Sequence, residues 1–302
     1  MTEYALSFMH ELGFDAEAID QLYCDIKKIY ANEEARDIFS KAVFEYESNI
    51  NADYSALRKS ADVAGELVGV HAYSAELLLF ICFSKHLREL YRERGISDQI
   101  WFDSMSDLKW KLWECKAVKG IWGSFVAGWF PRFFNMTRFA LGRLQFETVT
   151  VNDDCTVNGK EIKKGMKALA IHIPRTLTPL TKESRIDAYR QAIEFYADEF
   201  GEEPILFACH SWLLSEEMPK ILRDGSNIKS FCEDFEIVRY EKAKPGEYGD
   251  AWRLFDKEYT GNIDDFPGDS SLRRKYKEYL KNGGVMGCGM GYFFAEDIKD
   301  IK

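Results

Sequence analysis

The sequence predicts an α+β protein, with an all-helical N-terminal domain over residues 1–135 and a domain of mixed strands and helices over residues 136–302. Two observations carry this prediction. In the first part of the chain, apolar residues recur at helical spacing and no proline precedes Pro131. After Pro131, alternating and wholly apolar stretches of strand length are separated by helical segments. A chain of 302 residues is long enough for two such domains.

Four helices are predicted in the N-terminal domain. The first begins after Asp15, a residue type that caps helices, and carries apolar residues three and four apart from Ile19 to Ile29. The second includes residues 38–42, and the third contains the unbroken apolar run from Leu77 to Phe83. The fourth has one apolar face, formed by Trp101, Met105, Leu108, Leu112 and Cys115.

An aromatic stretch lies just before the predicted domain boundary. Its members have roughly helical spacing and are Trp122, Phe125, Trp129, Phe130, Phe133 and Phe134. A surface on which nucleic-acid bases stack would need interleaved cations, and the stretch holds only Arg132. The pattern therefore indicates a core or a domain interface, and we expect the stretch to be buried between the two domains.

The C-terminal domain is predicted to begin with several consecutive strands. Helices and strands then alternate through the rest of the domain. An Asn158–Gly159 dipeptide, which tolerates positive φ, predicts a hairpin between the first two long strands. The other predicted elements are strands over 143–151, 166–174, 204–210, 235–240 and 285–294, and helices over 184–200, 226–231 and 271–282.

The last predicted strand contains glycines at alternate positions. Gly287, Gly289 and Gly291 share one face of a strand and leave that face bare, so another chain segment or a ligand must approach it closely. A packed helix or neighbouring strand and a bound ligand chain are the two alternatives. The spacing differs from GxGxxG and no helix follows, which argues against a dinucleotide site.

Composition excludes several function classes. With 40 basic and 50 acidic residues, the net charge is −10, which disfavours non-specific binding to nucleic acid. The longest apolar run is too short to span a membrane, and the N-terminus lacks the pattern of a secretory signal. The seven cysteines include no CxxC pair and no zinc spacing, so we expect a reduced, cytoplasmic protein without a metal. The segment after Asp256 resembles a calcium loop, but its twelfth residue is Pro267, which has no side-chain oxygen.

Polar residues lie at the ends of two predicted apolar strands, those over 166–174 and 204–210. His172 lies near the end of the first, and Cys209, His210 and Ser211 end the second. Adjacent strand residues point to opposite faces, so Cys209 and His210 cannot act together as a dyad. If the strands are neighbours, His172 can meet Cys209 or Ser211. A buried inert cysteine and a hydrogen-bonded structural histidine are the alternatives that remain open.

Several segments of the C-terminal half resemble a known family. They are Gly142–Glu147, Ile171–Pro174, Cys209–Leu214, Ser226–Ile228 with the following Phe231, and Gly283–Gly291. These segments are similar to those of a bacterial family of GNAT-like acyltransferases, in which a helical N-terminal acyltransferase domain precedes a GNAT-like C-terminal domain. The resemblance implies a mixed sheet flanked by helices, with an acyl-coenzyme A thioester bound between two splayed parallel strands, here residues 168–173 and 205–210.

The resemblance also implies acyl transfer to an amine or a hydroxyl. Within it, we expect His172 to be the general base, because imidazole titrates near neutral pH. We expect Glu147 to orient that base or the acceptor, with a surface cross-strand ion pair as the alternative. Cys209 is a candidate covalent carrier of the acyl group, and Ser211 completes the predicted catalytic cluster.

The segment that should hold the coenzyme A phosphates departs from the GNAT pattern. Residues 175–182 contain no glycine, whereas GNAT enzymes use a glycine-rich loop here. We expect the phosphates to meet Arg175, Thr176, Thr178 and Lys182 instead. Coenzyme A thioester would then be a co-substrate, with no cofactor bound permanently. The alternative is a non-catalytic protein on a GNAT-like fold that binds a ligand or a partner; the oligomeric state stays open.

Overall fold

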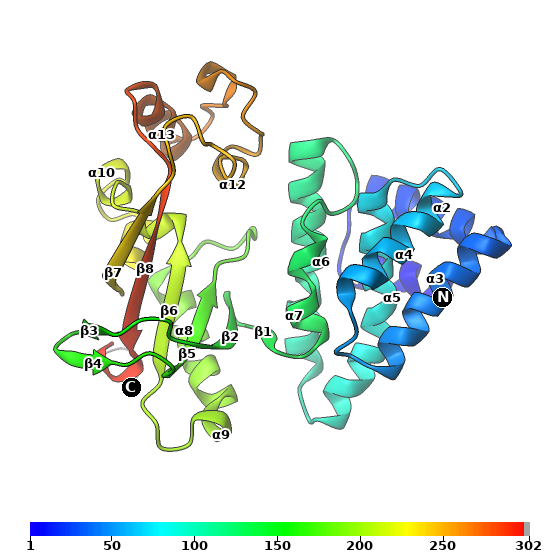
Figure 1. Cartoon of the computed structure of the whole chain (residues 1–302), viewed down its shortest axis with the longest axis horizontal. Helices are drawn as coiled ribbons and strands as arrows, with labels where there is room; N and C mark the ends of the chain where they lie inside the picture. The colour runs from blue at the N-terminus through cyan, green and yellow to red at the C-terminus, as the bar shows by residue number, and fades with distance from the viewer. Residues whose placement is uncertain (299–302) are drawn as a thin grey trace. The chain divides into compact units, whose positions relative to one another are not determined.

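The computed structural model describes residues 1–298 and confirms the predicted α+β class (Figure 1). The chain divides into two compact units, Met1–Phe139 and Ala140–Lys302. The division lies a few residues after the predicted boundary at residue 135. The first unit is helical, and the second contains a six-stranded sheet and a separate two-stranded hairpin.

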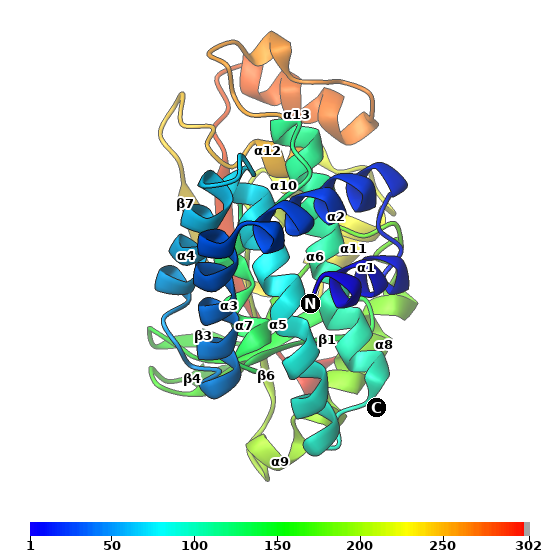
Figure 2. The same cartoon turned by 90° about the vertical axis from the view of Figure 1, so that its right-hand side faces the viewer.

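The helical unit is arranged around α5, which packs against α1, α2, α3, α4 and α6 (Figure 2). Its apolar run from Leu77 to Phe83 is fully buried, as the sequence predicts. The elements of this unit are α1 (Thr2–Glu11), α2 (Ala16–Ala31), α3 (Glu33–Ser48), α4 (Tyr54–Glu66), α5 (Ala72–Glu93), α6 (Asp98–Lys119), η1 (Ala127–Trp129) and α7 (Pro131–Phe134).

Two details of the helical unit differ from the prediction. Helices α1 and α4 were not predicted, because alanines and aromatic residues make much of their buried faces. Asp15 occupies the N-cap position of α2, but its side chain does not cap the helix. Its carboxylate instead accepts a hydrogen bond from the indole of Trp113 on α6.

The aromatic stretch contributes to the core of the helical unit itself. Phe80 of α5 contacts Phe130 and Phe134, with ring centroids 5.1 and 5.0 Å apart. Phe133 is fully buried as well. The expectation that the stretch is buried between domains is therefore wrong for these rings, because α5 already provides their apolar partners within one unit.

The C-terminal unit follows the predicted order of elements, but it adds the strand β1 and several short helices and divides the predicted helix over 184–200 into α8 and α9. Its elements are β1 (Arg138–Leu141), β2 (Leu144–Thr150), β3 (Cys155–Val157), β4 (Lys160–Ile162), β5 (Lys167–His172), α8 (Lys182–Phe195), α9 (Ala197–Phe200), β6 (Leu206–Ser211), η2 (Trp212–Leu214), α10 (Met218–Ile221), α11 (Asn227–Cys232), β7 (Glu236–Lys242), α12 (Trp252–Phe255), η3 (Ile263–Asp265), α13 (Ser271–Lys281), β8 (Gly287–Phe294) and η4 (Ala295–Asp297).

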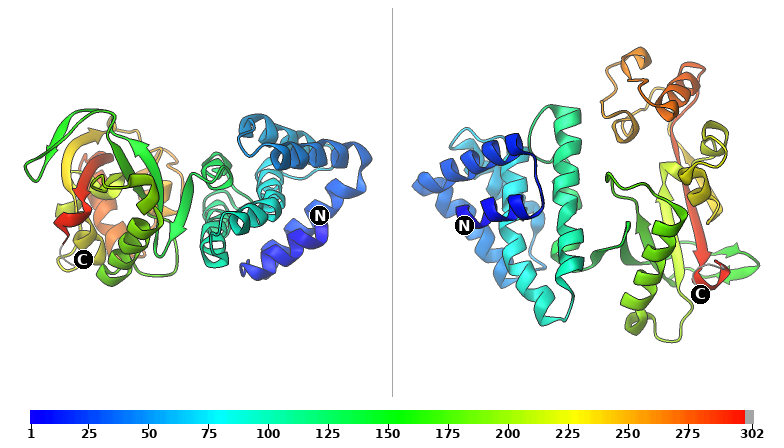
Figure 3. Two further views of the ribbon diagram at one scale, coloured as in Figure 1. Left: turned by 90° about the horizontal axis from the view of Figure 1, so that it is seen from below. Right: turned by 180° about the vertical axis from the view of Figure 1, so that it is seen from behind.

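The six strands of the main sheet have the order β1-β2-β5-β6-β8-β7. Figure 3 shows this unit from below and from behind. Strand β5 pairs antiparallel with β2 and parallel with β6, and β8 pairs antiparallel with β6 and β7. The parallel pairing joins Leu169 with Phe207 and Ala170 with Ala208, ahead of the C-terminal ends of both strands. The sheet therefore contains one parallel pair of neighbouring strands, β5 and β6, among the described residues.

Different elements pack against the two faces of the sheet. Helix α8 lies on one face, where Tyr189 contacts Phe207 and Phe293 at ring-centroid distances of 5.3 and 5.2 Å. The hairpin of β3 and β4 packs against the other face, where its Val157 and Ile162 share an apolar cluster with residues of β5, β6 and β8. Asn158 and Gly159 adopt φ values of 50° and 76°, which confirms the predicted hairpin turn.

The glycines of β8 are approached closely by other parts of the chain. A Cβ atom on Gly289 would overlap the carbonyl oxygen of Leu214 in η2, and one on Gly291 would crowd the side chain of Ile237. The packed-neighbour alternative is therefore correct, since protein atoms occupy the space that a ligand chain would need.

Candidate active site

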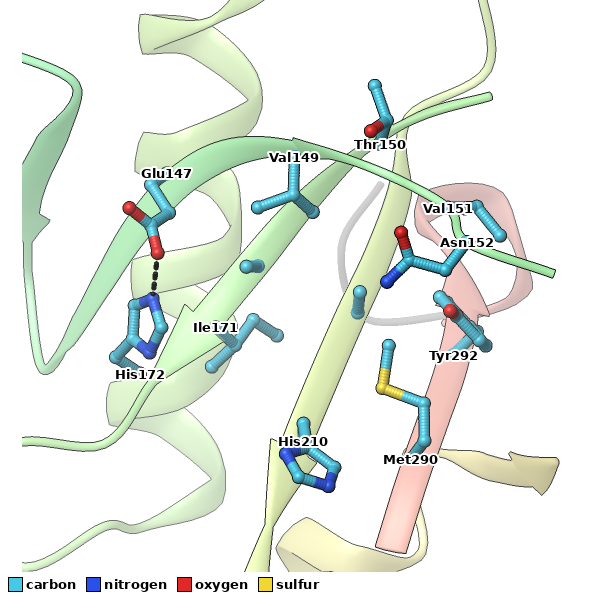
Figure 4. A pocket seen from close by; sticks show the side chains of 12 residues that line it. Glu147, Val149, Thr150, Val151, Asn152, Ile171, His172, His210, Met290 and Tyr292 are labelled. Carbon is cyan, nitrogen blue, oxygen red and sulfur yellow. Dashed lines mark hydrogen bonds and ion pairs between the residues drawn. The ribbon is translucent and has the colours of Figure 1, made fainter. Parts of the chain in front are cut away.

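A cavity of about 240 Å³ opens on the hairpin-covered face of the sheet, where β5 and β6 part (Figure 4). Beyond Ala170 and Ala208, Figure 4 shows the two strands separating toward His172 and His210. The cavity is lined by Glu147, Val149, Thr150, Val151, Asn152, Ala170, Ile171, His172, Ala208, His210, Met290 and Tyr292.

The strand register explains why these side chains meet. Glu147 lies opposite Ala170, and Ala170 lies beside Ala208. Residues two apart share a face, so His172 and His210 point to the same side as these three residues. The two alanines contribute only methyl groups to the floor, which leaves room for a ligand between the flanking strands.

His172 and Glu147 form a hydrogen-bonded pair at the edge of this cavity. The distance from His172 Nε2 to Glu147 Oε1 is 2.8 Å, and the side chains are 25% and 10% exposed. An ionised carboxylate only accepts, so the ring nitrogen that faces it carries the hydrogen. The second ring nitrogen, Nδ1, is then the one that can take a proton. The structure thus brings together the two residues that the sequence predicted as base and orienting group.

A second pair of the same kind involves a residue that the sequence analysis missed. His210 Nε2 lies 3.2 Å from Glu241 Oε2, and both side chains are 48% exposed. Glu241 belongs to β7, and the contact reaches across β8, which lies between β6 and β7. The predicted strand over 235–240 ends one residue before Glu241, whereas β7 extends to Lys242, and sequence alone did not place β7 two strands from β6.

Cys209 and Ser211 do not reach the cavity. Their position on β6 turns both side chains to the opposite face from His210. Cys209 is buried, and this burial raises the pKa of its thiol strongly, which disfavours the nucleophilic thiolate. Ser211 Oγ accepts a hydrogen bond from the Leu213 amide and caps η2. The predicted meeting of His172 with Cys209 or Ser211 is therefore corrected, because the strand period separates them.

Arg175, the leading candidate for a phosphate contact, is ion-paired in this structure. Its guanidinium donates from both terminal nitrogens to Asp256, with Nη2 3.0 Å from Oδ2. Asp256 also accepts from Arg273 of α13, so one carboxylate lies between two guanidinium groups. A phosphate would have to replace Asp256 to contact both arginines in the same way.

The other candidates lie on a loop that side chains hold in place. Arg143 donates from Nε to the Thr178 carbonyl at 2.8 Å and from Nη1 to the Pro174 carbonyl at 3.0 Å. Burial lowers the pKa of Arg143 to about 10. Thr176 Oγ1 donates to the Thr178 carbonyl and accepts from the Thr178 amide. Hydrogen bonds from Arg143 and Thr176 thus stabilise the conformation of this glycine-free loop. The sequence analysis missed Arg143, although it lies in a segment that carries the resemblance.

Lys182 is the first residue of α8 and follows Thr181, which caps the helix by accepting from the Ser184 amide. The amides of this first turn carry a partial positive charge, which favours a nearby anion. The loop and the beginning of α8 therefore present cations and amides beside the end of β5.

Comparison with known proteins identifies the family. A model of an N-acyltransferase N-terminal domain matches residues 4–136, and a model of a GNAT-like C-terminal domain matches residues 139–293. The chain belongs to this family of GNAT-like acyltransferases. No curated protein matches the chain.

Solved structures of acyltransferases share the fold of this family member. A mutant acyltransferase in complex with octanoyl-CoA has a TM-score of 0.73 and 19% identity, over 97% of this chain and 88% of its own. An acyltransferase in complex with decanoyl-CoA and teicoplanin has a TM-score of 0.72 and 19% identity, over 96% and 87% of the two chains. One in complex with CoA and 10C-teicoplanin has a TM-score of 0.71 and 20% identity, over 96% and 87%.

Two features are absent from residues 1–298, the part of the chain that the structure describes. Within that range, no group of histidine, cysteine and carboxylate side chains is arranged to hold a metal ion. None of the helices in the described part of the chain has both the length and the apolar character that crossing a membrane requires.

Proposed function

We propose that the protein transfers an acyl group from an acyl-coenzyme A thioester to an amine or hydroxyl acceptor. The observation that carries the proposal is the His172–Glu147 pair at the edge of a cavity where the parallel strands β5 and β6 part. The family and the fold neighbours support it, since two of those neighbours hold octanoyl-CoA or decanoyl-CoA.

In the proposed mechanism, His172 accepts the proton of the acceptor as its nitrogen or oxygen attacks the thioester carbonyl. Glu147 holds the imidazole in one orientation and stabilises the cation that forms. Backbone amides of the parting strands, which are not committed to pairing with each other, stabilise the developing oxyanion. The bond from carbonyl carbon to sulfur then breaks, and the thiolate takes up a proton to leave as coenzyme A.

The phosphates of coenzyme A would bind at the loop after β5, at Arg175, Thr176, Thr178 and Lys182. Arg175 would exchange the carboxylate of Asp256 for a phosphate, while Arg143 keeps the loop in its conformation. Coenzyme A acts here as a co-substrate that binds and leaves in each turnover.

We further propose that this is a bacterial, cytoplasmic enzyme of two domains. Its partners would be the thioester and the acceptor, with no nucleic acid, no membrane and no permanently bound cofactor. The acidic charge and the scattered cysteines support this part of the proposal.

The alternative is a non-catalytic protein that binds a ligand or a partner on the same fold. The glycine-free loop and the occupation of Arg175 by Asp256 favour this alternative. Isothermal titration calorimetry with octanoyl-CoA separates the two. Binding followed by thiol release in the presence of an amine or hydroxyl acceptor supports the enzyme, and no binding at millimolar octanoyl-CoA supports the alternative.

The first prediction concerns the phosphate contact. R175A should weaken octanoyl-CoA binding by about 1–3 kcal/mol, the usual value of one charge-assisted hydrogen bond. The matched control is R253A, which removes an arginine that pairs with Asp250 on the surface. Equal affinities of R175A and the unmutated protein in calorimetry would contradict the assignment.

The second prediction concerns the base. H172Q should lower thiol release from octanoyl-CoA by about 10²–10⁴-fold with 2-phenylethylamine or 2-phenylethanol as acceptor, because general-base catalysis is lost. Octanoyl-CoA affinity should stay within about twofold. The activity of the unmutated protein should fall at acidic pH, where an imidazole is protonated and cannot accept. An H172Q protein that retains its activity would exclude His172 as the base.

A further inference from the structure

A second histidine, His210, lines the cavity on the other side of the gap between β5 and β6, and it pairs with Glu241. We propose that His210 is a second proton acceptor, which removes a proton from a protonated amine before His172 acts. The inference rests on the proposed acyl transfer and adds the class of acceptor, a basic amine, together with a catalytic residue.

The geometry of His210 resembles that of His172. Each histidine lies two residues after an alanine of the cavity floor, His172 as the last residue of β5 and His210 as the last but one of β6. Each offers Nε2 to a carboxylate. His210 is the more exposed of the two, at 48% against 25%, so it is better placed to meet an acceptor that arrives from water. His172 and His210 both line one cavity, which lets the two imidazoles act on one bound amine in succession.

Glu241 is fixed by a further ion pair. Arg239 donates from Nε to Glu241 Oε1 at 3.0 Å and from Nη1 to Asp153 Oδ2 at 3.0 Å. Oε2 of Glu241 is thereby directed to His210. The charged or titratable groups on this face near His210 are Glu147 on β2, His172 on β5, Arg239 and Glu241 on β7, Cys288 and Tyr292 on β8, and Asp153 after β2. Acidic groups outnumber the one arginine among them, which favours a cationic acceptor.

The chemistry of an amine acceptor gives each histidine a task. A basic amine arrives as R–NH₃⁺ and has no lone pair for attack. His210 accepts one proton and leaves R–NH₂, whose nitrogen then forms the bond to the thioester carbon. As the carbon–sulfur bond breaks, His172 accepts a second proton from that nitrogen. One of the two protons goes to the thiolate and the other to water, so the products are the amide, the thiol and one proton.

A hydroxyl acceptor would need only one of these transfers. Its oxygen already has lone pairs, and the single proton that it loses can pass through His172 to the thiolate. A second proton acceptor is therefore needed only for amines that are protonated at neutral pH. The test accordingly compares a protonated amine with a neutral one.

The experiment compares two amines that differ in basicity. Thiol release from octanoyl-CoA is measured near neutral pH with 2-phenylethylamine, which is protonated there, and with 4-methoxyaniline, which is neutral. H210Q should lose about 100-fold in kcat/KM with 2-phenylethylamine, the lower part of the usual range for a proton acceptor, and less than about threefold with 4-methoxyaniline. H172Q should lose activity with both amines. E241Q should show a weaker form of the H210Q pattern, and H10Q, an exposed histidine on α1, is the control.

Each other result overturns the inference. Equal losses of H210Q with the two amines would mean that His210 positions the acceptor or supports the fold without taking its proton. If the unmutated protein binds octanoyl-CoA but releases no thiol with 2-phenylethylamine, a protonated amine is not an acceptor. His210 then has no ammonium proton to accept, and the inference is wrong. Absence of octanoyl-CoA binding in calorimetry would instead contradict the proposed function itself, so the two failures are distinguishable.

Discussion

At the scale of single residues, the best-defined electrostatic contact outside the cavity is a buried ion pair. Arg185 on α8 donates from Nε and Nη2 to the two oxygens of Asp234, and the side chains are 2% and 11% exposed. Arg185 Nη2 also donates to the carbonyl and hydroxyl oxygens of Ser230 within α11, and Tyr189 donates to Asp234. These contacts join α8 to the segment around α11, so the pair helps to keep α8, the helix after the loop of residues 173–181, in its place.

Removal of the arginine should therefore cost much of the stability of this unit. R185M should lower the free energy of unfolding by about 3–5 kcal/mol in urea titrations, because Asp234 is left as an uncompensated buried charge. The double variant R185M/D234L should recover part of this loss, since neither charge remains. R253Q, which breaks a surface pair, should cost less than about 1 kcal/mol. A similar small effect for R185M would show that water reaches Asp234.

At the scale of elements, β8 is the strand on which the arrangement of this sheet most depends. It pairs with both β6 and β7, and its glycines let η2 and β7 come close to its backbone. The same strand supplies Met290 and Tyr292 to the cavity, and the contact between His210 and Glu241 passes across it. Close packing on β8 therefore affects both the fold and the second histidine pair.

Gly289 and Gly249 both have φ values outside the left-handed region, so an alanine at either position causes no backbone strain. G289A should lower the free energy of unfolding by about 3 kcal/mol, because its methyl group would overlap the backbone of η2. G249A is the matched control, since open space surrounds that position and its φ is not in the left-handed region. Thermal unfolding followed by circular dichroism measures both. Equal melting temperatures for the two variants would contradict the tight packing of β8.

At the scale of the whole molecule, the chain consists of two compact units, each of which buries apolar residues of its own. The helical unit buries α5 and the aromatic residues around Phe80, whereas the other unit buries the sheet between α8 and the β3–β4 hairpin. Units with separate cores usually unfold in separate steps, so a change in one core should affect one step.

Differential scanning calorimetry tests this expectation. F80A should lower one of two transitions, by about 3–5 kcal/mol of unfolding free energy, because it leaves a cavity in the helical unit. R185M should lower the other transition. A single transition that both variants shift together would mean that the units unfold as one.

The sequence predicted most of this architecture where local signals were strong. The apolar run of α5 and the Asn158–Gly159 turn act within a few residues, so their structures follow from their own sequence. The pairing of Glu147 with His172 was expected only within the family resemblance, and the antiparallel register of β2 and β5 is what brings the two side chains together.

Other features depend on contacts between distant segments, which no local pattern encodes. Arg143 meets the loop at Pro174 and Thr178, and Asp256 reaches back to Arg175. Glu241 meets His210 across an intervening strand. Each contact requires the sheet order or a long connection, and neither can be derived from spacing alone.

Side chains of β6 point alternately to the cavity and to the core under α8. Substitutions on this one strand therefore fall into two kinds, those that change the cavity and those that change the core. Ala208 and His210 border the cavity, whereas Phe207 and Cys209 face the core under α8. Substitutions at the first set can alter which acceptors the protein accepts while leaving core packing intact, and substitutions at the second set do the opposite. A one-residue insertion would exchange the two sets and spoil both. New specificities in this family should therefore arise by replacement at alternate positions of β6, and insertions should be confined to the loops that follow it.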